Sequence, residues 1–521
     1  MRPILQKSRV VAIAVVAVAV VAGCAPGGTA TPPPGALTPS LKLGFLGQTN
    51  TLDPALSSRP INTYIFPLYD RLTVPDSDGA KPMRPMLATS WSFSADGKSL
   101  TMKLREDAYF HDGSLVDAAA VVQTMNRNKT LPQSTAAGYL KEVSSVEAVN
   151  SNTVKFSLSG GGADLLSLFG TVVGAIVNPK TFSSDLAHNP PPAAGSGPYV
   201  IAPGGTFPAD IKYMRPASGP PNWDKNAGRV KELEIIQVLP AAGINGVRAG
   251  QLDVALLTAD SIPAGRSFEA LGQYKGYYIP INAVLELLLN PHKPPFDNLL
   301  VRQAVAYAIN RQAIADDLFK GNCLATHQTV AESDWTYDKN FKDPYPFDPA
   351  KAKALLAQAG FPNGVSTSIS YRPTSIFPSV TQVYQAQLSA AGINATLDSI
   401  TPSLSIPRLN AHEYSLFSYV NAGGGDPSLI FQWNYGDLLS LAKGTPEESK
   451  VMALGNAALN PTLTREQRAA LYGQAWAMAA TQVWAVAICA QGELWIYNKR
   501  VTNIEGAPWL FAGEVDPRYF A

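Results

Sequence analysis

The sequence predicts an α/β fold, because signals for short strands and for helices alternate along the chain and no short-period repeat interrupts them. The chain has 521 residues, and an apolar share of 46% is enough for a substantial core. Basic side chains (41) nearly balance acidic ones (40). This composition excludes a disordered chain, and it argues against a nucleic-acid-binding protein, which needs an excess of Lys and Arg.

Residues 1–23 have the pattern of a lipoprotein signal peptide. A basic start precedes the apolar run 10–22, which is too short to span a bilayer. Small residues then lead directly to Cys24, as in a bacterial lipobox. We expect cleavage before Cys24 and attachment of a lipid to its thiol. The alternative is an ordinary cleavable signal followed by an incidental cysteine.

Residues 24–40 are predicted to be a tether that follows the lipidated cysteine. Five Pro and three Gly occur among residues 25–40, a composition that does not form a core. We therefore expect an extracytoplasmic protein, anchored by lipid to the cell membrane, on the outer face of the cytoplasmic membrane or in the periplasm.

Two further cysteines, Cys323 and Cys489, leave two alternatives open. They lie 166 positions apart, and nothing in the sequence indicates that they meet. The sequence favours two buried free thiols over a disulfide, although an oxidising compartment permits the latter.

The first elements of the mature chain are predicted to be strands. Residues 41–46 favour a short strand, and residues 86–110 favour a hairpin that turns at Asp96-Gly97. After a second turn, Ser114 and Asp117 have the spacing of a helix cap, so we expect a helix to begin at Ser114.

Four later helices are predicted from their end signals. Asp297 precedes a helix with an apolar face, and Asp348 with Pro349 opens another that ends at Gly360. The remaining two are expected to start at Ser379, ending at Gly392, and at Thr464 with Gln467.

The motifs of common enzymes are incomplete in this chain. Gly97-Lys98-Ser99 lacks the earlier glycine of a phosphate-binding loop, and the turn at residues 195–198 lacks the upstream glycine of a nucleophile elbow. His412-Glu413 has no second histidine one helical turn later. We therefore expect no catalytic site, no metal site and no cofactor.

Residues 83–127 carry the most specific pattern: a P-x-L-A-x-S-W block, an Asp-Gly turn, a strand ending in Leu-Arg, and Phe-His-Asp-Gly before a helix. This segment resembles the signature of the peptide/nickel solute-binding proteins of ABC importers, the oligopeptide- and dipeptide-binding group. Four more blocks resemble the family in the same order, at residues 195–199, 250–254, 295–311 and 347–361.

The resemblance implies a two-lobed periplasmic-binding-protein-like fold of type II, in the large peptide-binder class, with an extra subdomain on lobe one. It implies that two strands cross between the lobes, for which residues 282–290 and 493–497 are suited. The implied division is lobe one at 41–74, 196–284 and 489–521, the extra subdomain at 75–195, and lobe two at 285–488.

The resemblance also implies a ligand-binding loop with one departure. Peptide-binding relatives hold the ligand's α-ammonium with an aspartate three residues before an acidic-Pro pair. Here that pair is Asp426-Pro427, and the ammonium-binding position is Gly423. Either Asp426 replaces the missing acid, or it caps the loop and the ligand has no ammonium group. The other candidate ligand-binding residues are Asn421, Tyr419, Arg372, Tyr64 and Trp433.

The resulting hypothesis is a substrate-binding lipoprotein of an ABC importer that captures di- or oligopeptides by hinge closure. Its implied partners are the solute, the permease and ATPase chains, and the membrane through the lipid; nucleic acid is not among them, and we expect a monomer. The alternatives are a non-peptide solute such as a metal chelate or a glycan, a ligand sensor without a transport role, and an enzyme with its site in the cleft.

Overall fold

The computed structural model describes residues 37–521, except 58–61, 76–82, 424, 437–438 and 508–513. The signal peptide, Cys24 and most of the predicted tether lie outside the described residues. The first strand, β1, begins at Thr38 and so includes the last residues assigned to the tether. Among the described residues there is no helix of the length and apolarity that crossing a membrane requires.

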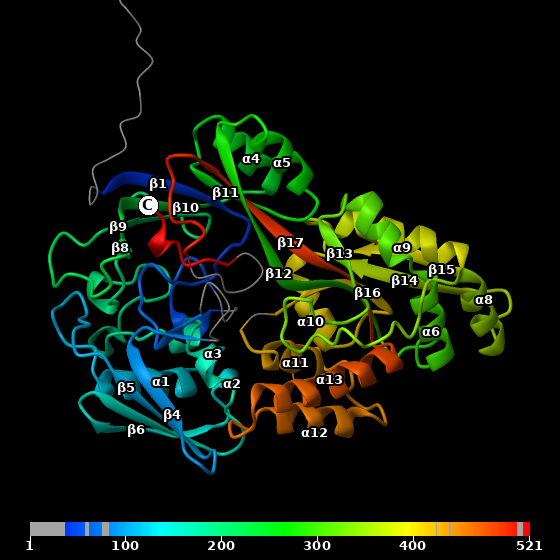
Figure 1. Ribbon diagram of the computed structural model, residues 1–521, viewed down its shortest axis with the longest axis horizontal. Coiled ribbons are helices and arrows are strands. Elements are labelled where there is room, and N and C mark those ends of the chain that lie inside the picture. The colour runs from blue at the N-terminus through cyan, green and yellow to red at the C-terminus, as the bar shows by residue number, and fades with distance from the viewer. Residues whose placement is uncertain (1–36, 58–61, 76–82, 424, 437–438, 508–513) are drawn as a thin grey trace, which may run out of the picture. The chain divides into compact units, whose positions relative to one another are not determined.

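One mixed sheet of eleven strands forms the frame of the described residues (Figure 1). Its order is β15-β14-β16-β12-β17-β11-β1-β10-β9-β8, and β13 pairs with β17. The strands are β1 (Thr38–Phe45), β8 (Val200–Ile201), β9 (Asp210–Met214), β10 (Val230–Gln237), β11 (Val254–Leu257), β12 (Tyr274–Leu289), β13 (Cys323–Ala325), β14 (Val365–Tyr371), β15 (Ile393–Ser399), β16 (Leu416–Ala422) and β17 (Ala485–Asn498).

The longest strands of this sheet, β12 and β17, connect its two halves. They pair antiparallel from Tyr274 opposite Asn498 to Leu288 opposite Ala485, with a register shift between Pro280 and Val284. One end of the pair adjoins β11 and the other adjoins β16. The two segments predicted to cross between lobes, 282–290 and 493–497, therefore fall in these strands, except that Asn290 follows the end of β12. Both strands begin well before the predicted segments.

Helices cover both halves of the sheet. The half with β1 and β8–β11, here called the first lobe, carries α4 (Pro240–Arg248) and α5 (Ile262–Glu269). The half with β14–β16, here called the second lobe, carries α6 (Leu299–Ala308), α7 (Arg311–Ala313), α8 (Pro349–Gln358), α9 (Phe377–Ala390), α10 (Ser405–Asn410), α11 (Ser428–Tyr435), α12 (Glu448–Ala458) and α13 (Arg465–Gln482).

A separate four-stranded sheet, ordered β4-β5-β7-β6, forms the extra subdomain together with three helices. Its members are β4 (Ala88–Phe93), β5 (Ser99–Leu104), α1 (Ala118–Thr130), α2 (Ala136–Tyr139), β6 (Val143–Asn150), β7 (Thr153–Leu158) and α3 (Leu165–Leu168), with β2 (Thr73–Val74) and β3 (Arg84–Pro85) pairing beside it. Short turns of 3-10 or π helix occur at Pro54–Leu56, Val172–Gly174, Pro179–Thr181, Pro192–Ala194, Ile314–Leu318, Pro402–Leu404 and Pro517–Tyr519.

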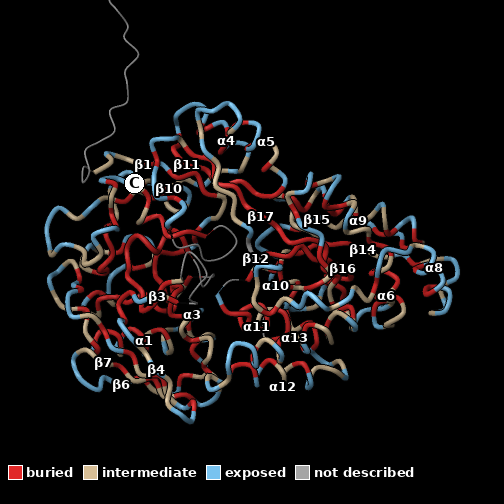
Figure 2. The backbone as a smooth tube through the Cα atoms, viewed as in Figure 1, coloured by how far each residue is buried: buried red, intermediate tan, exposed pale blue. Residues whose placement is uncertain are grey.

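Each of these parts has its own buried cluster (Figure 2). The first lobe packs around Leu43, Tyr213 and Trp495, and the extra subdomain packs around Met102 and Phe156. Residues of the segment 172–194, which was assigned to the extra subdomain, pack in the first-lobe cluster. The crossing strand β17 is buried along nearly its whole length.

Most of the predicted elements are confirmed, with their end signals. The hairpin turns at Gly97, whose φ of +69° favours glycine. Asp348 caps α8 by accepting from Lys351 N, and Thr464 with Gln467 forms a capping box at α13.

Two helix starts were predicted wrongly. The helix expected at Ser114 begins at Ala118 and is capped by Asp117, whose side chain accepts from Ala120 N. Ser114 instead donates to Asp112 in the preceding turn. The helix expected at Ser379 begins two residues earlier, at Phe377.

A buried ion network fixes the segment after β17 to the first lobe. Arg518 pairs with Asp70 and, at 3.0 Å, with Asp516, and Arg71 pairs with Asp516 at 2.5 Å. All four side chains are fully buried, so each charge depends on its partners.

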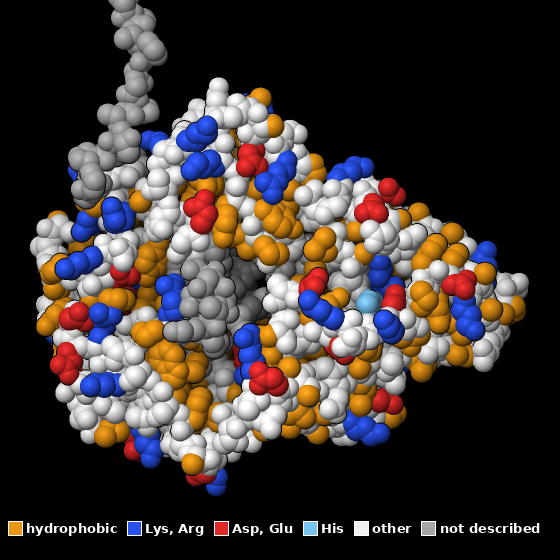
Figure 3. Space-filling model, in the orientation of Figure 1, with side chains coloured by type: hydrophobic (Ala, Val, Ile, Leu, Met, Phe, Trp, Pro, Cys, Tyr) orange, Lys and Arg blue, Asp and Glu red, His pale blue; other side chains and the backbone are white. Residues whose placement is uncertain are grey.

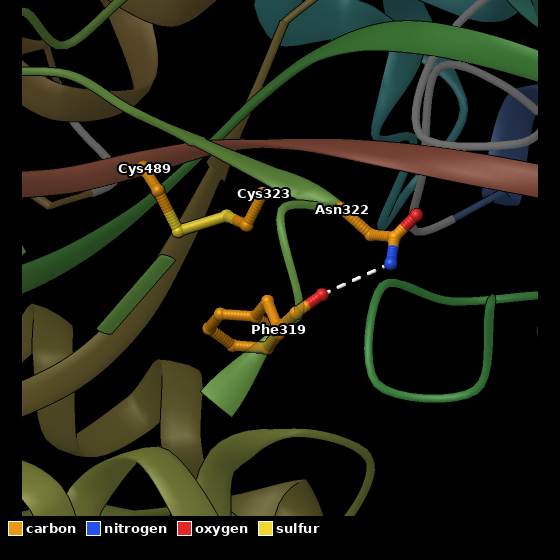
Figure 4. Close-up of a disulfide and its surroundings, with 4 residues drawn as sticks. All are labelled: Phe319, Asn322, Cys323 and Cys489. Carbon is orange, nitrogen blue, oxygen red and sulfur yellow. Dashed lines mark hydrogen bonds between the residues drawn. A yellow bond between two sulfur atoms is a disulfide. The ribbon is translucent and has the colours of Figure 1, made fainter. Parts of the chain in front are cut away.

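Cys323 and Cys489 form a disulfide between β13 and β17 (Figure 4). The expectation of free thiols was therefore wrong. The β13–β17 register sets Cys323 opposite Gln491, which is two residues from Cys489 on the same strand, and so brings the cysteines close together. Their Cα atoms are 5.5 Å apart, within the range that a disulfide requires. Beside it, the Asn322 side chain donates to the Phe319 carbonyl at 3.0 Å.

Candidate functional site

Five of the predicted site residues lie on one continuous segment of the second lobe. Tyr419 and Asn421 are on β16, Gly423 and Asp426 are in the following loop, and Trp433 is on α11. β16 pairs with the crossing strand β12, with Asn421 opposite Val284. The segment is thus placed where the second lobe meets the strands that lead to the first.

Asp426 is buried and already has partners. Its carboxylate accepts from Ser428 N at 3.0 Å and forms an ion pair with Arg468 of α13 at 2.8 Å. The Arg468 guanidinium also donates to the Ala458 carbonyl. This geometry favours the alternative in which Asp426 caps the loop before α11 over the one in which it receives a ligand ammonium group.

The glycines beside Asp426 let the loop pack closely against the extra subdomain. Gly423 is buried and has no side chain to offer a ligand. Gly425 has a φ of +73°, and a Cβ atom there would lie 3.3 Å from the side chain of Ser167 in α3. A side chain at Gly425 would therefore meet both backbone strain and crowding.

Asn421 of β16 belongs to a buried polar cluster that includes Glu286 of the neighbouring strand β12. Its Nδ2 donates to Thr329 Oγ1 at 2.9 Å, and Thr329 Oγ1 donates to Glu286 Oε1 at 2.6 Å. Burial raises the pKa of Glu286 to about 8, although hydrogen bonding to Thr329 and Asn421 acts in the opposite direction. Sequence reasoning missed Glu286, although it is the only charged residue in the apolar run 282–290.

The second crossing strand also carries a buried carboxyl group, Glu493. Burial and the charge of Glu514 both raise the pKa of Glu493 well above its ordinary value. Glu514 accepts from the backbone N–H and the hydroxyl of Thr63, at 2.9 and 2.5 Å. Each crossing strand therefore has one buried acid, Glu286 toward the second lobe and Glu493 toward the first.

The remaining predicted residues have other surroundings. Tyr64 is buried in the first-lobe cluster, and its hydroxyl donates to the Gly47 carbonyl at 2.7 Å. Tyr419 is buried in a second-lobe cluster with Trp484. Arg372 follows β14 and places its guanidinium 4.7 Å from the centre of the Phe377 ring. Tyr64 and Tyr419 are therefore core residues in this structure.

Trp433 lines a cavity of about 380 Å³ between the extra subdomain and the second lobe. On one side lie α2, α3 and the residues between them, and on the other lie α11 and the end of α12. The lining residues are Thr135, Gly138, Tyr139, Lys141, Glu142, Gly161, Asp164, Leu165, Leu168, Leu429, Gln432, Trp433 and Leu459. None of these except Trp433 was predicted as a site residue.

The described residues contain no group of three or more His, Cys, Asp or Glu side chains placed to hold a metal ion. On the face shown in Figure 3, acidic and basic side chains are interspersed rather than gathered by sign. The candidate site contains hydrogen-bonding groups, single carboxylates and aromatic rings.

Comparison with known proteins gives a consistent result. A sequence profile described as "Bacterial extracellular solute-binding proteins, family 5 Middle" matches residues 82–438. Heme-binding protein A of Haemophilus influenzae is 28% identical over 458 residues, which cover 80% of each chain. Glutathione-binding protein GsiB of Escherichia coli O1:K1 / APEC is 30% identical over 334 residues, which cover 62% of each chain.

The fold agrees with a solved structure of the same kind. The dipeptide-binding protein from Pseudoalteromonas sp. SM9913, in complex with Met-Leu, has a TM-score of 0.79 and 20% identity, with 92% of this chain and 99% of that chain covered. The fold is thus the two-lobed type II binding-protein fold with an extra subdomain. Because the profile match spans more than half of the sequence, this chain belongs to family 5 of the bacterial extracellular solute-binding proteins, which capture solutes and are not enzymes.

Proposed function

We propose that this chain is the substrate-binding lipoprotein of an ABC importer, anchored outside the cytoplasm through Cys24, and that it captures peptides by closing its lobes. The observation that carries the proposal is the β12–β17 pair, which joins the two halves of the main sheet. Two long strands with a register shift at their middle form a suitable hinge. The permease and ATPase of the importer are separate chains.

Peptide is the leading solute class. One relative of this chain is a glutathione-binding protein, and glutathione is itself a small peptide. A dipeptide-binding protein shares the fold. We propose that the solute binds beside the end of β16, where Asn421 lies opposite Val284 of the crossing strand β12.

A non-peptide solute is the second candidate, and a specific observation favours it. Gly423 supplies no acid for an α-ammonium group, and the carboxylate of Asp426 is paired with Arg468. A relative that binds heme supports this candidate, since heme has no ammonium group. Burial of an ammonium ion without a charge partner would cost several kcal/mol of binding free energy, which counts against a peptide with a free N-terminus. Identification of the solute decides between the two candidates.

The test is mass spectrometry of the solute released when the purified protein is denatured. A peptide supports the leading candidate, and a chelate, a glycan or heme replaces it. The identified solute, added back to ligand-free protein, is expected to reduce the radius of gyration and to raise the melting temperature. A matched compound absent from the released material serves as the control. Tight binding that changes neither quantity would contradict closure.

The role in transport is tested separately. Adjacent genes for a permease and an ATPase, together with loss of solute uptake when this gene is deleted, are the expected result. An adjacent receptor kinase with unchanged uptake would indicate a sensor instead.

A further inference from the structure

The extra subdomain docks on the second lobe through direct backbone contacts. The N–H groups of Gly162 and Ala163 both donate to the Leu459 carbonyl, at 2.8 and 2.9 Å. A Cβ atom at Gly161 would lie 2.3 Å from that of Leu459, so only glycine permits this approach. In addition, Leu429 of α11 packs in the buried cluster of the extra subdomain. The junction is therefore specific, and both of its sides contribute to the adjoining cavity.

The cavity at this junction has an apolar body. Leu165 and Leu168 come from the extra subdomain, and Leu429 and Trp433 come from α11. Tyr139 lines the same cavity as Trp433, so two aromatic side chains contribute to its wall. A volume of about 380 Å³ is at the lower end for sites that bind small molecules. The cavity therefore suits a small solute or one part of a larger one.

Asp164 gives this cavity an excess of negative charge. It lines the cavity and forms no ion pair with any residue in the described ranges. The positive charge that lowers the pKa of Asp164 is the guanidinium of Arg468, which is already paired with Asp426. Two carboxylates thus share one cation.

The other charges of the cavity wall do not remove this excess. Lys141 and Glu142 carry one charge of each sign. Burial and the neighbouring Asp426 raise the pKa of Asp164 to about 6, although Ser428 and Arg468 act in the opposite direction. At neutral pH the carboxylate is mainly ionised, in surroundings that favour neutralisation by a further cation.

We propose that the cavity binds an organic ammonium or guanidinium ion with an apolar body, and that Asp164 is its charge partner. The aromatic rings of Trp433 and Tyr139 would contribute to binding, since a cation is attracted to the face of such rings. This inference rests on the proposed function, because it assigns one part of the captured solute. A cation held here contacts both sides of the junction, so its binding stabilises the docked arrangement.

The experiment measures the affinity of two probes for the mature protein by isothermal titration calorimetry. The probes are 2-phenylethylammonium and its neutral N-acetyl derivative. We expect the wild type to prefer the cation by about tenfold or more, as for a charge pair at a binding site. The preference is expected to fall as the pH is lowered from 7.5 to 5, because Asp164 becomes protonated.

The Asp164→Asn variant is expected to lose the preference for the cation, whereas the control Asp185→Asn, at an exposed acid elsewhere in the chain, retains it. Trp433→Ala is expected to weaken both probes. The melting temperature of Asp164→Asn should equal or exceed that of the wild type, since repulsion from Asp426 is removed.

Equal affinity of the wild type for the two probes would overturn the inference, and so would an unchanged preference in Asp164→Asn. If that variant does not fold, the comparison of the two probes with the wild type still decides. Capture of the natural solute with lobe closure, but without probe binding, would refute only this inference. Absence of solute capture and of closure would instead refute the proposed function.

Discussion

Arg468 at the start of α13 forms a buried ion pair with Asp426 in the loop that precedes α11, at 2.8 Å. The side chains retain only 10% and 7% of their exposure, so neither charge has ready access to solvent. This pair holds the loop of Gly423 and Gly425 against the second lobe, which makes the shape of the predicted binding loop dependent on a residue of another helix.

We expect Arg468→Met to lower the free energy of unfolding by about 3–5 kcal/mol, because it leaves the Asp426 carboxylate buried without its partner. Denaturant unfolding followed by circular dichroism measures the change. The control is Arg266→Met, which removes one side of an exposed pair with Glu269 and is expected to cost at most about 1 kcal/mol. Similar losses in the two variants would contradict a structural role for the buried pair.

Glu286→Gln is expected to change how stability depends on pH. Burial raises the pKa of Glu286 from 4.5 to about 8, so folding favours its protonated form. Its contribution to stability is fully present below pH 4.5 and is lost as the pH rises through about 8. Glutamine resembles the protonated form and does not titrate, so the variant should gain stability relative to the wild type as the pH rises.

Melting temperatures of both proteins between pH 5 and 9 measure this difference. The exposed Glu147 on β6 provides the control, and Glu147→Gln should follow the wild type throughout. Parallel curves for Glu286→Gln and the wild type would show that Glu286 is ionised in the folded protein.

Replacing both Cys323 and Cys489 with alanine is expected to lower the free energy of unfolding by about 2–5 kcal/mol, because the disulfide restrains the unfolded chain. A reductant should destabilise the wild type by a similar amount and leave the double variant unchanged. Mass spectrometry after thiol alkylation without reduction checks the premise. Alkylation of both cysteines in folded, unreduced protein would refute the disulfide.

Cys24→Ala is expected to abolish lipid attachment and to release the protein from membranes. Each buried methylene of an acyl chain contributes about 0.8 kcal/mol to membrane binding, and the variant loses all of them. Partition between aqueous and detergent phases measures the effect, with wild-type protein as the reference. A variant that partitions like the wild type would exclude a lipid anchor at this cysteine.

The elements that sequence reasoning placed correctly are those with local signals. Asp348 and Thr464 each cap a helix within a few residues of themselves, and Gly97 fixes its hairpin turn by its own backbone angle. The helix start predicted at Ser114 was wrong because Asp117, three residues later, is an equally good cap. Leu115 forms a bridge with Tyr109 instead of entering the helix, and this contact is not encoded by spacing alone.

The candidate binding loop was proposed from a local signal of the same kind. Asn421, Gly423 and Asp426 follow one another along the chain, so a single loop motif identifies them. Their partners Arg468 and Thr329 come from other elements, and no short-range pattern relates them to the loop. The pairing of the two cysteines depended in the same way on the register between β13 and β17.

The network of Asp70, Arg71, Asp516 and Arg518 has a consequence for the order in which the protein folds. Synthesis proceeds from the N-terminus, so a ribosome makes Asp70 and Arg71 long before it reaches their partners. Until then the first lobe lacks both β17 and the guanidinium of Arg518. Burial of the Asp70 and Arg71 charges without these partners is unfavourable. The native burial of Asp70 and Arg71 is therefore completed only after residue 518 has been synthesised.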